Sequence, residues 1–170
     1  MRTLAAALLA LSLAACGGKA APAPAAVSPP TTPTNDAQVA AKVLVNVDEE
    51  GVAVSGFDPT GYATDAKAVP GVGEQAVQHG GATYWFATAA HKAAFEAAPA
   101  KFVPHYGGYC AYAMSQGRLS PIQPEQFEIV DGQLLLFTNA ELKKLFDADR
   151  AALKAKADAN WPQMVAQHGK

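Results

Sequence analysis

The sequence predicts a small α+β domain, with β-hairpins and packed helices, over residues 36–170. Tyr84-Trp85-Phe86 is typical of a short strand, because aromatic side chains suit the half-buried surface of a sheet. Asp131-Gly132 between two apolar runs predicts a further pair of strands joined by a tight turn. Leu142, Leu145 and Phe146 recur at the spacing of one helix face. The length is ordinary for a single domain.

The start of the chain predicts targeting rather than fold. Residues 1–15 are expected to form a signal peptide, since the apolar run Leu4–Leu13 is too short to span a bilayer. Leu13-Ala14-Ala15-Cys16 resembles the bacterial lipobox, which implies cleavage before Cys16 and lipid modification of its thiol. The alternative is an ordinary secretory peptide cut near Ala15. By the same resemblance, Gly17 favours anchoring in the outer rather than the inner membrane, with the domain facing the periplasm.

Residues 16–35 carry the lipidated cysteine and a segment rich in Ala, Pro, Ser and Thr. This composition cannot bury a core and predicts a partly extended tether. The net charge of the chain is −2, without a basic run, which argues against nucleic-acid binding because phosphate neutralisation needs clustered Lys and Arg. No internal repeat, second membrane segment or glycine-rich phosphate loop is apparent.

The first part of the domain predicts short strands. Val43–Val47 is expected to be a helix or strand, and Val52–Tyr62 a strand that ends in a turn at Asp58-Pro59. In that turn the Asp58 carboxylate can accept hydrogen bonds from nearby backbone N–H groups. Gln75–His79 is expected to be an edge strand, joined through Gly80-Gly81 to the strand that ends at Phe86.

The next element is a helix with clear end signals. Thr88 is a suitable N-cap for a helix over Ala89–Ala98, which Pro99 would stop. A loop over residues 102–106 then leads to Gly107-Gly108. Two adjacent glycines before an aromatic residue and a thiol indicate unusual backbone angles, or a close approach of the backbone to another group.

The last part of the chain predicts a hairpin over Phe127–Phe137 and two helices. Thr138 or Asn139 can cap a helix over Ala140–Ala148. A second helix over Arg150–Asn160 is expected to end at Trp161-Pro162. The remaining tail is short, and His168 within it is expected to be exposed and inert.

Three stretches carry a resemblance to the YHS-domain proteins: Gly56-Phe57-Asp58-Pro59-Thr60-Gly61-Tyr62, Tyr84–Phe95, and Ala98–Tyr112 with its Tyr-Gly-Gly-Tyr-Cys-Ala core. Ile129–Leu134 and Ala157–Pro162 extend it over most of the domain. The resemblance implies a small α+β fold related to treble-clef modules, and a link to metal handling, chiefly of copper.

The chain departs from that family at the metal-binding positions. Metal-binding members carry cysteines at about the places of Gly61, Ala87 and His91, and only His91 keeps ligand chemistry here. The chain instead resembles the longer periplasmic branch of the family, in which the Gly-Gly-Tyr-Cys-Ala segment is characteristic. The family's usual metal site therefore cannot be transferred.

A different metal site can be assembled from the residues themselves. Cys110, His105 and Met114 lie close in sequence, and Cys110 and Met114 share one face if this segment is helical. Imidazole, thiolate and thioether form a soft ligand set that suits copper, and His91 could join them. The alternatives are a buried inert thiol, a hydrogen-bonded His105 and a Met114 that fills the core. A nucleophilic pair of Cys110 with His105 is a further hypothesis, without an orienting Asp or Asn to support it.

The sequence therefore predicts a non-enzymatic lipoprotein of the bacterial envelope, anchored to the membrane through Cys16. The leading hypothesis for its function is metal binding, with copper as the first candidate and with Cys110, His105, Met114 and His91 as ligands. An envelope protein is the other candidate partner. The alternative hypothesis is a non-catalytic ligand- or protein-binding module in which Cys110 is structural.

Overall fold

The structure, a computed structural model, describes residues 42–170 and is α+β as predicted. The predicted signal peptide, the predicted lipidation site at Cys16 and the predicted tether lie outside the described residues. The strands form two separate antiparallel hairpins: β1 (Val72–His79) with β2 (Ala82–Phe86), and β3 (Gln123–Val130) with β4 (Gln133–Phe137). The α-helices are α1 (Pro59–Thr64), α2 (Ala89–Ala97), α3 (Ala111–Ser115), α4 (Ala140–Ala148) and α5 (Arg150–His168). Three short 3₁₀ helices complete the set: η1 (Val54–Gly56), η2 (Pro99–Lys101) and η3 (His105–Gly108).

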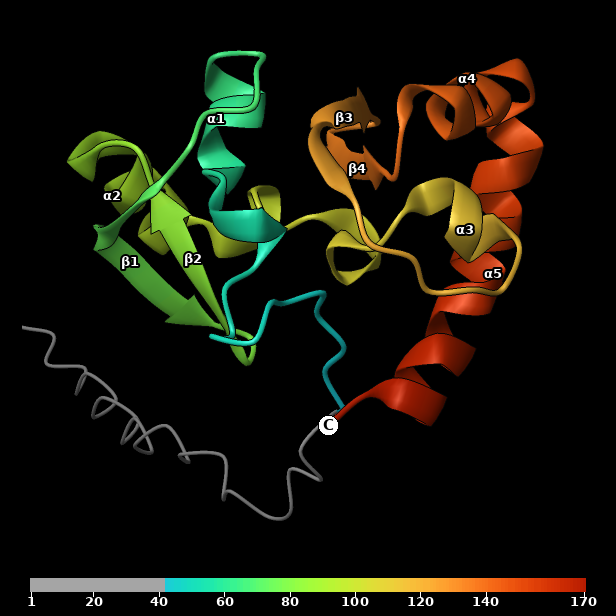
Figure 1. The fold of residues 1–170 in the computed structure, drawn as a ribbon, viewed down its shortest axis with the longest axis horizontal. Helices are drawn as coiled ribbons and strands as arrows, with labels where there is room; N and C mark the ends of the chain where they lie inside the picture. Colours follow the sequence, from blue (N-terminus) through green and yellow to red (C-terminus); the bar gives the residue numbers. More distant parts are fainter. Residues whose placement is uncertain (1–41) are drawn as a thin grey trace, which may run out of the picture. The chain divides into compact units, whose positions relative to one another are not determined.

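The two hairpins and the helices that follow them form a structural repeat, so the expectation that the chain has no internal repeat was wrong. Strand, strand and helix are 8, 5 and 9 residues long in both β1–β2–α2 and β3–β4–α4. Each element of the second unit begins 51 residues after its counterpart, as in Val72 and Gln123. Both hairpins shift register at the same place, four residues into the first strand. Figure 1 shows the two units side by side, with α5 along the second.

The repeat extends to the turn and short helix that precede each hairpin. Val54, Ser55 and Gly56 have positive φ before α1, and Tyr106, Gly107 and Gly108 have positive φ before α3. The next helix then begins after Asp58 in the first unit and after Cys110 in the second. The backbone N–H of Asp58 donates to Val69 O, and that of Cys110 to Ser120 O. Cys110 is therefore the counterpart of Asp58.

The core consists of two apolar clusters that share strand β4. Leu134 and Leu136 belong to the first cluster, with buried aromatic residues of the first unit such as Phe86 and Phe95. Leu135 and Phe137 belong to the second, with Phe146 among its members. Because successive side chains of a strand point to opposite faces, β4 can contribute to both clusters. This explains why β4 is an almost continuous apolar run.

Local signals in the sequence were confirmed. Asp131 and Gly132 both have positive φ, at 52° and 76°, as the predicted tight turn requires. Thr88 accepts a hydrogen bond from His91 N at the start of α2, and Asn139 accepts one from Leu142 N at the start of α4. Each helix therefore begins where its capping residue predicts.

Three predictions of secondary structure were wrong. Val43–Val47 is neither helix nor strand; it is extended chain whose Val43 pairs with Lys170 through two backbone hydrogen bonds. The segment Val52–Tyr62, expected to be a strand that ends in a turn at Asp58-Pro59, instead forms η1 and α1, because the Asp58 carboxylate caps a helix that begins at Pro59.

The third error concerns α5, which continues through Pro162 to His168. Proline removes one helical hydrogen bond, but tertiary contacts hold the residues just before it, and Met164 after it packs against the second apolar cluster. Asn160 donates to Met114 O, and Trp161 packs edge-on against the ring of Tyr106. His168 is exposed as predicted, although it lies in a helix rather than in a tail.

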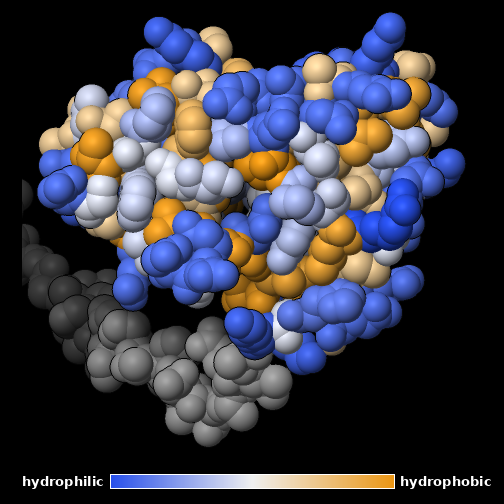
Figure 2. Space-filling model, viewed as in Figure 1, coloured by the Kyte–Doolittle hydropathy of each residue, from blue (hydrophilic) through white to orange (hydrophobic). Residues whose placement is uncertain are grey.

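Within the described residues, no helix is both long and apolar enough to span a bilayer. Hydrophilic and hydrophobic residues are interspersed over the face shown in Figure 2.

Candidate functional site

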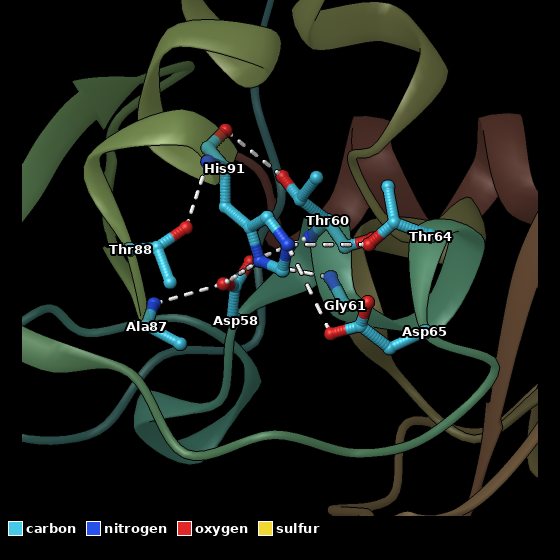
Figure 3. A network of polar contacts seen from close by, with 8 residues as sticks. All are labelled: Asp58, Thr60, Gly61, Thr64, Asp65, Ala87, Thr88 and His91. Carbon is cyan, nitrogen blue, oxygen red and sulfur yellow. Dashed lines mark hydrogen bonds and ion pairs between the residues drawn. The ribbon is translucent and has the colours of Figure 1, made fainter.

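The buried Asp58 carboxylate is the centre of the largest polar network that joins the elements of the first unit (Figure 3). Oδ1 accepts from the backbone N–H groups of Thr60 and Gly61, at 2.8 and 3.3 Å. Oδ2 accepts from Ala87 N at 2.8 Å and lies 2.7 Å from Nδ1 of His91. The carboxylate is thus fully hydrogen-bonded, which offsets the cost of burying a charge.

This network orients the His91 imidazole. Asp58 accepts the Nδ1 proton, so in the neutral ring Nε2 carries the lone pair. Nε2 points to the surface, 3.4 Å from Thr64 Oγ1 and 3.8 Å from Asp65 Oδ2, and the side chain is 16% exposed (Figure 3). An imidazole held by a carboxylate in this way resembles the second-shell arrangement of many metal-ligating histidines. Among the described residues, Asp65 is the one further carboxylate close to Nε2 that could also bind a metal ion.

The network occupies the place where the family resemblance puts cysteines. The backbone N–H groups of Gly61 and Ala87 both donate to the Asp58 carboxylate, and His91 contacts it through its ring. The three positions do come together, but a carboxylate lies between them. The sequence analysis assigned Asp58 its turn chemistry correctly and missed its contact with His91. The sequence feature that could have indicated this contact is an acidic N-cap, Asp58, before one short helix, together with His91 in the first turn of another.

Cys110 and Met114 lie together in the second apolar cluster, and both side chains are fully buried. Cys110 precedes α3, whose Met114 N–H donates to Cys110 O, so the expected helical relation between them is present. In the repeat, Cys110 replaces Asp58 and Leu142 replaces His91, and Leu142 packs against the same cluster. The second unit therefore has apolar packing where the first has a hydrogen-bonded Asp–His pair.

His105 belongs to a separate polar group beside α5. Its Nε2 lies 3.2 Å from Asp158 Oδ1, which also accepts from the Tyr106 hydroxyl at 2.8 Å. Burial lowers the pKa of His105, although the Asp158 carboxylate opposes that shift. Burial would raise the pKa of Asp158, but hydrogen bonds from Tyr106, Lys154 and His105 lower it overall. The group ties η3 to α5.

The four candidate metal ligands are thus divided among different environments. His91 is held by Asp58, and His105 by Asp158, while Cys110 and Met114 lie in the apolar core. Among residues 42–170, no three His, Cys, Asp or Glu side chains are grouped closely enough to hold a metal ion.

A second candidate site, which the sequence analysis did not find, is an apolar cleft of about 370 Å³ where the two units meet. We call it the boundary cleft; residues that line it include Tyr62, Ala63, Lys101, Phe102, Ile129 and Leu134. They come from α1 and from the end of η2 in the first unit, and from the β3–β4 hairpin in the second. Because they are far apart in sequence, no local pattern predicts the cleft.

The fold and these sites define a small α+β domain built from two hairpin–helix units, with a buried Asp–His pair in one and a buried thiol in the other. Comparison of the chain with protein-family models, with curated proteins and with solved structures found no match.

Proposed function

We propose that this domain is a non-catalytic binding module that takes a small, largely apolar ligand in the boundary cleft. The proposal includes the sequence-based expectation that the domain is tethered to the bacterial envelope through Cys16. It also assigns Cys110 a structural role in the second apolar cluster.

The cleft is the observation that carries this proposal. Ligand sites are concave, mostly apolar and roughly 300–1,000 Å³ in volume, and the cleft lies at the small end of that range. Tyr62, Phe102 and Leu134 form its buried floor, whereas Ile129 is 41% exposed on its wall. The floor is rigid because it belongs to the first apolar cluster.

Copper binding through Cys110, His105, Met114 and His91 stays a prediction, and the geometry favours the ligand-binding alternative. A thiol in the position of Asp58, in an apolar cluster against which Leu142 packs, is explained by apolar packing alone. The Asp58–His91 pair likewise has a sufficient structural role, since it joins the beginnings of α1 and α2 to the end of β2.

An uncharged aromatic probe, phenylbutanol, tests the proposal. In a soluble form of the protein that begins at Gly17, we expect it to shift the backbone amide resonances of Ala63, Phe102 and Gly132, which all line the cleft. A dissociation constant of about 4 mM is expected, because a small ligand gains roughly 0.3 kcal/mol per non-hydrogen atom and phenylbutanol has about 11 of them.

A blocking variant makes this experiment specific. Ala63→Trp places a large side chain over the cleft from an exposed helical position, and should abolish the shifts. Ala151→Trp, at an exposed position in α5 away from the cleft, should leave them unchanged. Shifts that persist in Ala63→Trp, or that map elsewhere, would refute the cleft as the ligand site.

A further inference from the structure

We infer that the natural ligand of the boundary cleft is a small amphipathic anion: an apolar body with one carboxylate or similar group that faces Lys101. This inference rests on the proposed function and adds the chemical class of the ligand. It follows from the distribution of polar groups around the cleft.

The interior of the cleft offers apolar contact and almost no free polar group. Tyr62 and Lys101 are the two residues with polar side chains among those that line it. The Tyr62 hydroxyl already donates to Pro124 O at 3.1 Å, and burial raises its pKa, so that it remains a neutral phenol. Tyr62 also packs edge-on against Phe127, with ring centroids 4.8 Å apart. The body of the ligand must therefore be held by burial of apolar surface.

Lys101 supplies the charge at the rim. Its Nζ lies 5.5 Å from the centroid of the Phe102 ring, which places the ammonium beside the floor of the cleft. Within the described part of the chain Lys101 forms no ion pair, in contrast to Lys143 and Lys154. Asp131, next to Gly132 on the opposite wall, does not pair with it either. The Lys101 ammonium would therefore be available to form an ion pair with an anionic group of the ligand at the rim.

The expected contribution of this charge is modest, because Lys101 is exposed. An exposed ion pair contributes roughly 0.2–1 kcal/mol. The upper part of this range, from about 0.4 to 1 kcal/mol, corresponds to a two- to five-fold change in affinity. It should also weaken as salt is added. Apolar burial would thus supply most of the affinity, and Lys101 would select the sign of the charge.

Three probes with the same phenylbutyl body test this inference: phenylbutyrate, phenylbutanol and phenylbutylamine. Titrations followed by amide shifts at Ala63 and Gly132 should rank them in that order, with each step roughly two- to five-fold. Lys101→Ala should remove the difference in affinity between the acid and the alcohol. Lys144→Ala, at an exposed position in α4 outside the cleft, is the matched control and should preserve the order.

The outcomes separate the two proposals. Equal binding of acid and alcohol, or tightest binding of the amine, overturns the anion inference and leaves the binding module intact. Absence of binding by all three probes overturns the binding module as well. If Lys101→Ala still binds the acid more tightly than the alcohol, the inference is also overturned, because another group must then interact with the carboxylate.

Discussion

Replacing Gly107 with alanine should destabilise the domain by about 3 kcal/mol or more, a large share of the stability of a domain this size. Gly107 has a φ of +60°, which costs an L-residue about 1 kcal/mol. In addition, a Cβ atom at this position would collide with the backbone oxygen of Leu44 and lie 3.0 Å from the Trp161 ring. The backbone cannot yield easily, because Asn46 N donates to Gly107 O at 2.8 Å.

Gly132→Ala is the matched control for this prediction. Gly132 also has positive φ, at +76°, but a Cβ atom there would meet no atom within 4 Å. Gly132→Ala should therefore lower the free energy of unfolding only by the cost of a positive φ, about 1 kcal/mol. Urea unfolding followed by tryptophan fluorescence gives both values. Equal losses in the two variants would show that the close approach at Gly107 is unimportant.

Asp58→Asn should destabilise the domain by about 2–4 kcal/mol, since it removes the acceptor that four donors share. An amide keeps one acceptor oxygen, and its NH₂ group would face either Thr60 N and Gly61 N or Ala87 N and His91 Nδ1, so two of the four donors lose their acceptor. The loss can be measured by urea unfolding at neutral pH. The Nδ1 proton resonance of His91 should shift or broaden in the same variant.

Asp65→Asn controls for a general effect of charge near His91. Asp65 is 38% exposed, and its Oδ2 lies 3.8 Å from His91 Nε2, so the change should cost less than about 0.5 kcal/mol. A loss as large as that of Asp58→Asn would mean that the outer side of the imidazole, rather than its hydrogen bond to Asp58, stabilises the fold.

Elements with local signals were predictable from the sequence. Thr88 and Asn139 cap helices through hydrogen bonds that span three residues, and Asp131-Gly132 satisfies a turn by itself. The glycine pair at 107–108 was also interpreted correctly, because positive φ and close packing are properties that glycine alone combines.

Features that depend on long-range contacts were not predictable in this way. The length of α5 is set by what packs against Asn160 and Trp161, not by Pro162. At a spacing of 51 residues the units share Glu74-Gln75 and Glu125-Gln126, Gly81 and Gly132, Phe86 and Phe137, and Phe95 and Phe146, besides two alanines and a lysine. These identities are scattered, and the spacing of the elements is what makes the repeat evident. Asp58 and His91, 33 residues apart, meet only because α1 and α2 begin side by side.

The candidate metal set illustrates the same limit. The relation between Cys110 and Met114 was local and was predicted, whereas the burial of both and the pairing of His105 with Asp158 depend on α4 and α5. Cys110 takes the position of Asp58 in the repeat, and this position lies within the second apolar cluster. The proposed structural role of the thiol rests on this placement.

Copper(I) titration of the soluble form that begins at Gly17, under reducing conditions and with a competing chelator, tests this central claim most directly. We predict no binding above the chelator's background, and the same result for a folded Cys110→Ala variant. Tight one-to-one binding that Cys110→Ala abolishes and His105→Ala weakens would contradict the account and make the thiol a metal ligand.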